Sequence, residues 1–86
     1  MAEFCSGAVV KAIAGREKNE IFVILKIDNS FAYLVNGKSR PLECPKKKNF
    51  RHLQILKSNS GLNLNLIKNC DVIKYLKDYI KSSDCK

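Results

Sequence analysis

The sequence has one histidine, no tryptophan and no cluster of glycines, and these scarcities exclude several classes of function. The single histidine, His52, with no serine or cysteine placed beside a base, offers no pair of nucleophile and general base for catalysis. The four glycines are isolated from one another, so no glycine-rich phosphate loop precedes a helix. We therefore expect no enzymatic activity, no cofactor and no small-molecule substrate.

Close cysteine pairs and long apolar segments are also missing. The four cysteines, at positions 5, 44, 70 and 85, include no C-x-x-C pair, whereas structural zinc sites normally use closely spaced ligands. We expect no metal site and predict free thiols, with Cys44 and Cys70 partly buried. The longest apolar run covers residues 21–25, far short of the roughly 20 residues that cross a bilayer, and the N-terminus does not resemble a signal peptide. We expect a cytoplasmic protein with no membrane partner.

Positive charge is abundant, and most of it lies in one block. The net charge is +8 over 86 residues. Residues 1–36 are neutral, whereas residues 37–57 carry seven lysines and arginines and one glutamate, a net charge of +6. A cationic surface on a neutral scaffold is typical of proteins that bind the phosphates of RNA or DNA. The competing interpretation is a solvated loop that only aids solubility.

Short strands separated by turns dominate the first two thirds of the chain. Apolar and β-branched residues predict strands over residues 8–13, 20–27, 31–35 and 53–56. Asn36-Gly37 predicts a type I′ hairpin turn, followed by a strand over residues 38–44 that ends before Pro45. Short strands at this spacing favour a small β-barrel over a β-α-β unit. The fold class is therefore predicted to be mainly β.

The last third of the chain predicts a connecting segment and a helix. After a barrel over residues 1–57, residues 58–68 form a linker or an extended strap, and residues 69–86 form a short C-terminal helix and tail. Asn69 is the expected N-cap of that helix. Helical spacing predicts a buried face of Val72, Ile73, Leu76, Tyr79 and Ile80 and a solvent face of Lys74, Lys77 and Lys81.

Two segments carry a resemblance to a known family. Residues 7–24 place the loop A-G-R-E-K-N between two apolar strands, which resembles the KOW motif of ribosomal and transcription-linked proteins. Beyond it, N-G-K-x-R and P-K-K-K-N-x-x-H-L resemble the continuation in bacterial KOW-domain RNA-binding proteins, which are similar to archaeal and eukaryotic large-subunit ribosomal proteins. The resemblance covers residues 7–56. It implies an SH3-like β-barrel that binds RNA through the first loop and the adjacent basic segments, without enzymatic activity.

The same resemblance assigns roles to residues of the first loop. Gly15 is expected to be the motif glycine that lets the loop turn close to RNA, with Arg16 and Lys18 as phosphate contacts. Asn19 stands where the family often has a second glycine, and asparagine tolerates the left-handed backbone region. The other predicted RNA-binding residues are Lys38, Arg40, Lys46, Lys47, Lys48, Asn49, Arg51 and His52.

We expect structured RNA, ribosomal RNA foremost, as the partner, with ribosomal proteins as possible further contacts. Arginine binds phosphate bidentately, which predicts phosphate contacts for Arg16, Arg40 and Arg51; the alternative is structural ion pairs with Glu17 or Glu43. A competing function is a protein-interaction SH3-like module whose basic block docks an acidic segment of the translation or transcription machinery. Double-stranded DNA is a further alternative partner.

The aromatic residues are mostly assigned to the core. Phe22, Phe31 and Tyr33 lie on predicted strands, where packing is the default role. Phe50, inside the basic block, is predicted as a core anchor, with base stacking as the alternative. For His52, a cap on a loop or a packing role is the alternative to the predicted RNA contact.

Overall fold

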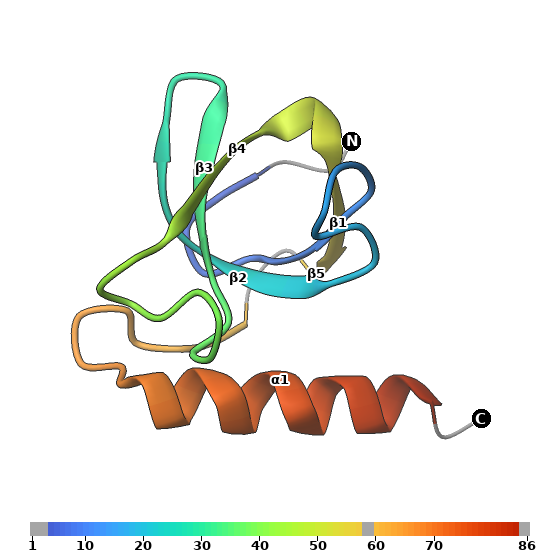
Figure 1. Ribbon diagram of the computed structural model, residues 1–86. Coiled ribbons are helices and arrows are strands. Elements are labelled where there is room, and N and C mark those ends of the chain that lie inside the picture. Colours follow the sequence, from blue (N-terminus) through green and yellow to red (C-terminus); the bar gives the residue numbers. More distant parts are fainter. Residues whose placement is uncertain (1–3, 58–59, 85–86) are drawn as a thin grey trace.

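A computed structural model describes residues 4–57 and 60–84, with side chains described as far as residue 81. These residues form five antiparallel strands and one C-terminal helix, so the molecule is mainly β (Figure 1). The strands run in the spatial order β4-β3-β2-β1-β5, with a 3₁₀ helix, η1, between the last two along the chain. The bounds are β1 Val9–Ala12, β2 Ile21–Asp28, β3 Phe31–Val35, β4 Lys46–Asn49, η1 Phe50–His52, β5 Leu53–Lys57 and α1 Asn69–Asp84.

The sheet is strongly curled but is not closed into a barrel. Strands β4 and β5 are its two edges, yet only the three residues of η1 separate them along the chain. A connection this short forces the sheet to bend until its edges approach, as the ribbon shows (Figure 1). Within the described part of the chain no ladder of hydrogen bonds joins β4 to β5, so the expected closed barrel is replaced by an open sheet.

Both faces of the sheet are apolar near its centre. The inner cluster lies inside the curl and includes Val10, Phe22 and Leu34, while the outer cluster includes Val23 and packs against the helix. Strand β2 contributes alternate residues to both clusters, which is why residues 21–25 read as one continuous apolar run. Helix α1 lies along the outer face and completes the second cluster (Figure 1).

A β-bulge at Leu25 sets which residues of β2 face outward. The pairing with β3 shifts between Ile24 and Lys26, so two residues of β2 oppose one residue of β3. Because of this extra residue, Lys26 points to the outer face and Ile27 returns to the inner cluster. Without the bulge, strict alternation would bury the Lys26 ammonium among apolar residues.

The sequence predicted a hairpin turn at Asn36-Gly37 and a strand over residues 38–44, and both predictions are wrong. Asn36 begins a loop instead, in which its side-chain oxygen accepts the backbone N–H groups of Lys38 and Arg40 at 3.0 and 2.9 Å. This side chain therefore replaces the backbone pairing that a two-residue hairpin would make. The strand that pairs with β3 is β4, which is formed by the lysines of the basic block.

The 36–45 loop and the start of α1 are bonded together. Asn69 does not cap the helix: its side chain accepts the N–H of Leu42 at 2.7 Å and donates to the Glu43 carboxylate at 2.9 Å. That hydrogen bond from Asn69 is the main cause that lowers the pKa of Glu43. Capping comes from Asp71, whose carboxylate accepts the N–H of Lys68 at 3.0 Å.

The helix buries a face close to the predicted one. Val72 and Leu76 are buried, and the three predicted solvent lysines, Lys74, Lys77 and Lys81, are exposed. Ile80 was predicted to be buried and is 40% exposed, whereas Tyr75, which was not predicted, packs against the outer cluster. No helix in residues 4–57 or 60–84 is long and apolar enough to cross a membrane.

The segment before the helix is irregular. Residues 60–68 contain a turn at 64–66 and no strand. Leu62, Leu64 and Ile67 pack on the outer cluster, whereas Leu66 points to solvent and is 75% exposed. Cys44 and Cys70, predicted to be partly buried, are both exposed, and Cys85 lies outside the described residues.

Candidate nucleic-acid interface

The pleat of β4 divides the basic block between two faces of the sheet. Lys46 and Lys48 lie opposite Leu34 and Ala32 in the ladder, so both project to the inner face. Lys47 lies opposite Tyr33 and projects to the outer face. A run of lysines that reads as one patch in the sequence therefore serves two separate surfaces.

On the inner side, Glu17 gathers three of the predicted RNA-binding bases. Its carboxylate lies 3.3 Å from the Lys48 ammonium, 3.7 Å from the Arg40 guanidinium and 3.9 Å from the Lys46 ammonium. These are the ion pairs within the described residues, and all share this carboxylate. Side chains of Glu17 and Lys48 are only 14% and 10% exposed, so the pair at the centre of this Glu17 cluster is largely removed from water.

The backbone of the β1–β2 loop, residues 13–20, places Glu17 over β4. Gly15 and Asn19 both adopt left-handed conformations, with φ of 82° and 76°, as the sequence predicted for Asn19. The N–H of Asn19 bonds to the Ala12 carbonyl at 2.7 Å and closes the loop. A Cβ on Gly15 would lie 3.0 Å from the Lys48 ammonium, so glycine here also makes room for the buried lysine.

The electrostatics of the cluster favour the ionised form of Glu17. Burial by itself would raise the pKa of this carboxyl, but the hydrogen bond from Lys48 and the charge of Lys46 outweigh it and hold the pKa below the ordinary 4.5. Arg40 pairs with Glu17, and such a structural ion pair was the alternative to a direct phosphate contact of this arginine. Three cations around one carboxylate still leave a surplus of positive charge.

Exposed bases surround this cluster. Arg16 and Lys18 stand on the β1–β2 loop and are exposed. The η1 turn lies beside the same loop because the Ile13 N–H donates to the His52 carbonyl at 2.9 Å. Asn49 caps that turn by accepting the N–H of Arg51 at 3.0 Å. The His52 side chain is exposed, which excludes the packing role considered for it.

No model of a protein family matches this sequence, and no curated protein matches it either. Most predicted site residues meet around the β1–β2 loop: Gly15, Arg16, Lys18, Asn19, Arg40, Lys46, Lys48, Arg51 and His52.

Lys38 and Lys47 lie apart from the loop. Lys38 shares a small cavity with Ile73, Lys77 and Ile80 on the helix side of the molecule. Lys47 extends over aromatic rings of the outer face, 4.8 Å from the Phe31 centroid and 5.9 Å from that of Tyr33.

Of the four aromatic residues that the sequence assigned to the core, two have that role. Phe22 is fully buried, and Phe50 packs on the inner cluster with its ring stacked on Phe4 at 4.5 Å between centroids. Phe31 and Tyr33 are not core residues: Phe31 is 36% exposed and neither packs on an apolar cluster of the described residues. The sequence signal for this was alternation, since the buried residues Ala32 and Leu34 each follow one of these two aromatic residues along the strand.

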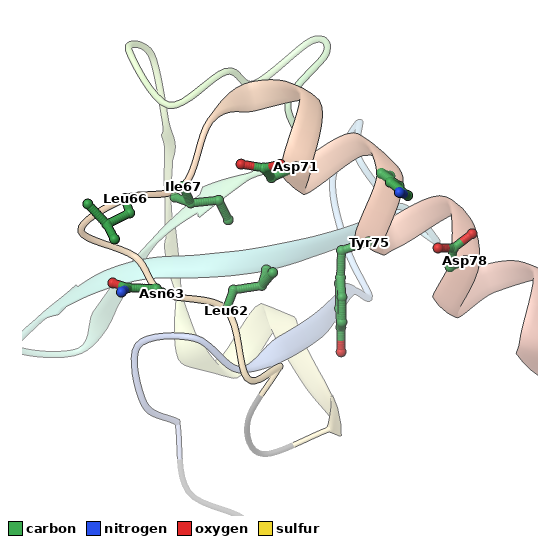
Figure 2. A pocket seen from close by; sticks show the side chains of 8 residues that line it. Leu62, Asn63, Leu66, Ile67, Asp71, Tyr75 and Asp78 are labelled. Carbon is green, nitrogen blue, oxygen red and sulfur yellow. The ribbon is translucent and has the colours of Figure 1, made fainter.

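An apolar cavity of about 370 Å³ lies between residues 62–67 and α1 (Figure 2). Leu62, Leu66 and Ile67 line one side, and Tyr75 lies on the helix side with its buried hydroxyl unpartnered among the described residues. Asp71, Asp78 and Lys74 border this cavity, so its charged residues have no surplus of positive charge to attract phosphates or acidic peptides. The cavity is therefore not part of the cationic site.

Proposed function

We propose that this protein is a non-catalytic RNA-binding module that binds the phosphates of structured RNA at the β1–β2 loop. The observation that carries the proposal is the Glu17 cluster, which draws Arg40, Lys46 and Lys48 beneath a loop that presents Arg16 and Lys18. These five bases face two acids, Glu17 and Glu20, so the loop surface keeps a net charge of +3. Arg51 on the neighbouring η1 turn extends the same surface.

The strand order and the η1 connection also support an open form of the SH3-like sheet that the KOW resemblance implies. Under this proposal the partner is folded RNA, with ribosomal RNA as the first candidate. Binding works by neutralising phosphates and releasing their counterions. About four contacts, from Arg16, Lys18, Lys46 and Arg51, give a slope of log K against log salt of roughly −3 to −4.

A titration of a labelled RNA stem-loop at several salt concentrations tests the proposal. Replacing Arg16 and Lys18 by glutamine removes two exposed phosphate contacts, so we expect weaker binding and a salt slope about 2 units shallower. The matched control replaces Lys74 and Lys81 by glutamine, which removes the same charge from the exposed face of α1. If both variants lose the same RNA affinity, the effect comes from net charge alone and the loop is not the binding site.

The competing function is a protein-interaction module that docks an acidic segment on the same bases. It predicts that an acidic peptide such as oligoglutamate competes fully with RNA and binds with similar affinity. The RNA assignment would be supported if the protein sediments with ribosomes at low salt and if ribonuclease releases it from them. A protein that never sediments with ribosomes and binds no stem-loop would contradict it.

A further inference from the structure

The outer face of β2, β3 and β4 carries an arrangement that the loop site does not use. Phe31 and Tyr33 lie two residues apart on β3 and project from the same face of the sheet. Neither packs on an apolar cluster of the described residues. Phe31 is exposed and Tyr33 is half-buried, although aromatic surface left in water costs free energy. The tip of the β2–β3 hairpin lies away from α1 (Figure 1), and neither ring packs on the outer cluster to which the helix contributes.

The ladder places charged and polar residues on either side of both rings. Tyr33 lies between Lys26 of β2 and Lys47 of β4, and Phe31 lies between Asp28 and Asn49 in the next row. The Lys26 ammonium is 4.9 Å from the Tyr33 centroid, and the Lys47 ammonium is 4.8 Å from the Phe31 centroid. Both ammonium groups therefore rest on ring faces, and within the described residues neither is paired with a carboxylate.

Aromatic rings beside unpaired ammonium groups match the chemistry of a single-stranded nucleic acid. Bases stack on rings, and the phosphates that join them need cations within a few ångströms. The two rings are separated by roughly 7 Å along the strand, which leaves room for each to take its own base. A folded helix of RNA keeps its bases stacked internally, so only unpaired nucleotides fit such a surface.

We propose that the outer face of β2–β4 binds unpaired nucleotides of RNA, with Phe31 and Tyr33 stacking on bases and Lys26 and Lys47 holding the adjoining phosphates. The inference rests on the proposed RNA-binding function and adds a second subsite to it. Each lysine leaves its ring face when a base arrives and turns to a phosphate. Asp28 beside Phe31 repels phosphate, so the backbone follows the lysine row.

Strand β4 connects the two subsites. It is an edge strand, and its lysines alternate between the Glu17 cluster on the inner face and the aromatic rings on the outer face. A nucleic acid that crosses this edge contacts both surfaces without any movement of the sheet. The preferred ligand is therefore a folded RNA with an unpaired strand next to a helix.

Binding of an oligouridylate of about ten nucleotides, compared with an abasic strand of equal length, tests the inference. The variants Phe31→Leu and Tyr33→Leu keep an apolar side chain but remove the ring. We expect each to weaken binding of oligouridylate at least about fivefold, because a lost base stack costs this much or more. Binding of the abasic strand and the salt slope stay unchanged, since no charge is altered.

Ile80→Ala is the matched control, because Ile80 is an exposed large apolar residue on the helix side. Circular dichroism of each variant confirms the fold before binding is measured. Unchanged oligouridylate binding, or equal losses with both strands, would overturn the stacking subsite. Wild-type protein that binds the stem-loop but not oligouridylate would overturn this inference and leave the proposed function standing. Binding to neither RNA would overturn both.

Discussion

A single carboxylate organises the cationic site at the level of residues. Glu17 is largely buried with Lys48, and this pair joins the β1–β2 loop to strand β4 at the open side of the curled sheet. Arg40 and Lys46 attach to the other carboxylate oxygen and bring the 36–45 loop to the same point. Glu17 thus holds three bases in place without any ligand, and this would lower the entropic cost of the RNA binding that we propose.

We predict that Glu17→Gln destabilises the protein at neutral pH by roughly 1 to 3 kcal/mol, because the Lys48 ammonium loses the partner of a largely buried bond. The folded-state pKa of Glu17 is below its ordinary 4.5, so its contribution is complete above that value. It is lost as the pH falls through the folded-state pKa. Urea unfolding at neutral and strongly acidic pH measures both effects.

The difference between wild type and Glu17→Gln should therefore shrink in acid. Glu20→Gln is the control, since Glu20 is an exposed carboxylate of the same loop. A constant difference at every pH would show that Glu17 acts through packing and not through its charge.

At the level of elements, the docking of α1 depends on one turn of the 36–45 loop. Gly37 has a φ of 80°, and a Cβ there would lie 2.5 Å from the Asn69 carbonyl oxygen and 2.6 Å from the Ile73 side chain. The glycine therefore does more than turn the chain, because it lets the first turn of the helix approach the loop. The hydrogen bonds between Asn69 and the loop depend on this approach.

Gly37→Ala and Gly61→Ala form a matched pair that isolates this contact. Both glycines have a φ of 80°, but an added Cβ meets nothing within 4 Å at Gly61. Both variants bear the cost of a left-handed alanine, and we expect Gly37→Ala to lose a further 1 to 3 kcal/mol or so from the clash. Thermal unfolding of the two variants gives the difference directly, and equal stabilities would exclude close docking of the helix.

At the level of the whole molecule, the two apolar clusters share strand β2. Phe22 and Ile24 belong to the inner cluster, and Val23 between them belongs to the outer one. The helix and the curled sheet are therefore parts of one folding unit. Neither cluster is large, so each depends on the other for stability.

We predict that Leu76→Ala, a change on the helix, destabilises the sheet as much as the helix. Leu76 is 5% exposed in the outer cluster, and its truncation should cost about 2 to 5 kcal/mol. Urea unfolding followed by far-ultraviolet dichroism and by hydrogen exchange of β2 amides should give coincident transitions. Lys77→Ala, which changes the exposed residue next to Leu76, should leave both transitions unchanged. Sheet protection that survives loss of the helix would contradict the shared core.

Local patterns predicted most of the secondary structure. The strand at residues 31–35, the strand predicted over residues 53–56 and the central strand β2 follow from β-branched and aromatic content. The left-handed conformation of Asn19 agrees with its place where the KOW resemblance puts a second glycine. The prediction failed at Asn36-Gly37, where side-chain hydrogen bonds and the approach of α1 override the hairpin preference. It also failed at Phe31 and Tyr33, because aromatic strand residues do not show which face a distant helix will cover.

The mainly β character, the C-terminal helix and the excess of positive charge follow from composition and from spacing along the chain. Tertiary structure alone decided how that charge is used. The pleat of β4 sends Lys46 and Lys48 to Glu17 and Lys47 to the aromatic rings, and the bulge at Leu25 turns Lys26 toward the same rings. Register between strands is set by the packing of both faces at once, and no single segment of the chain contains that information.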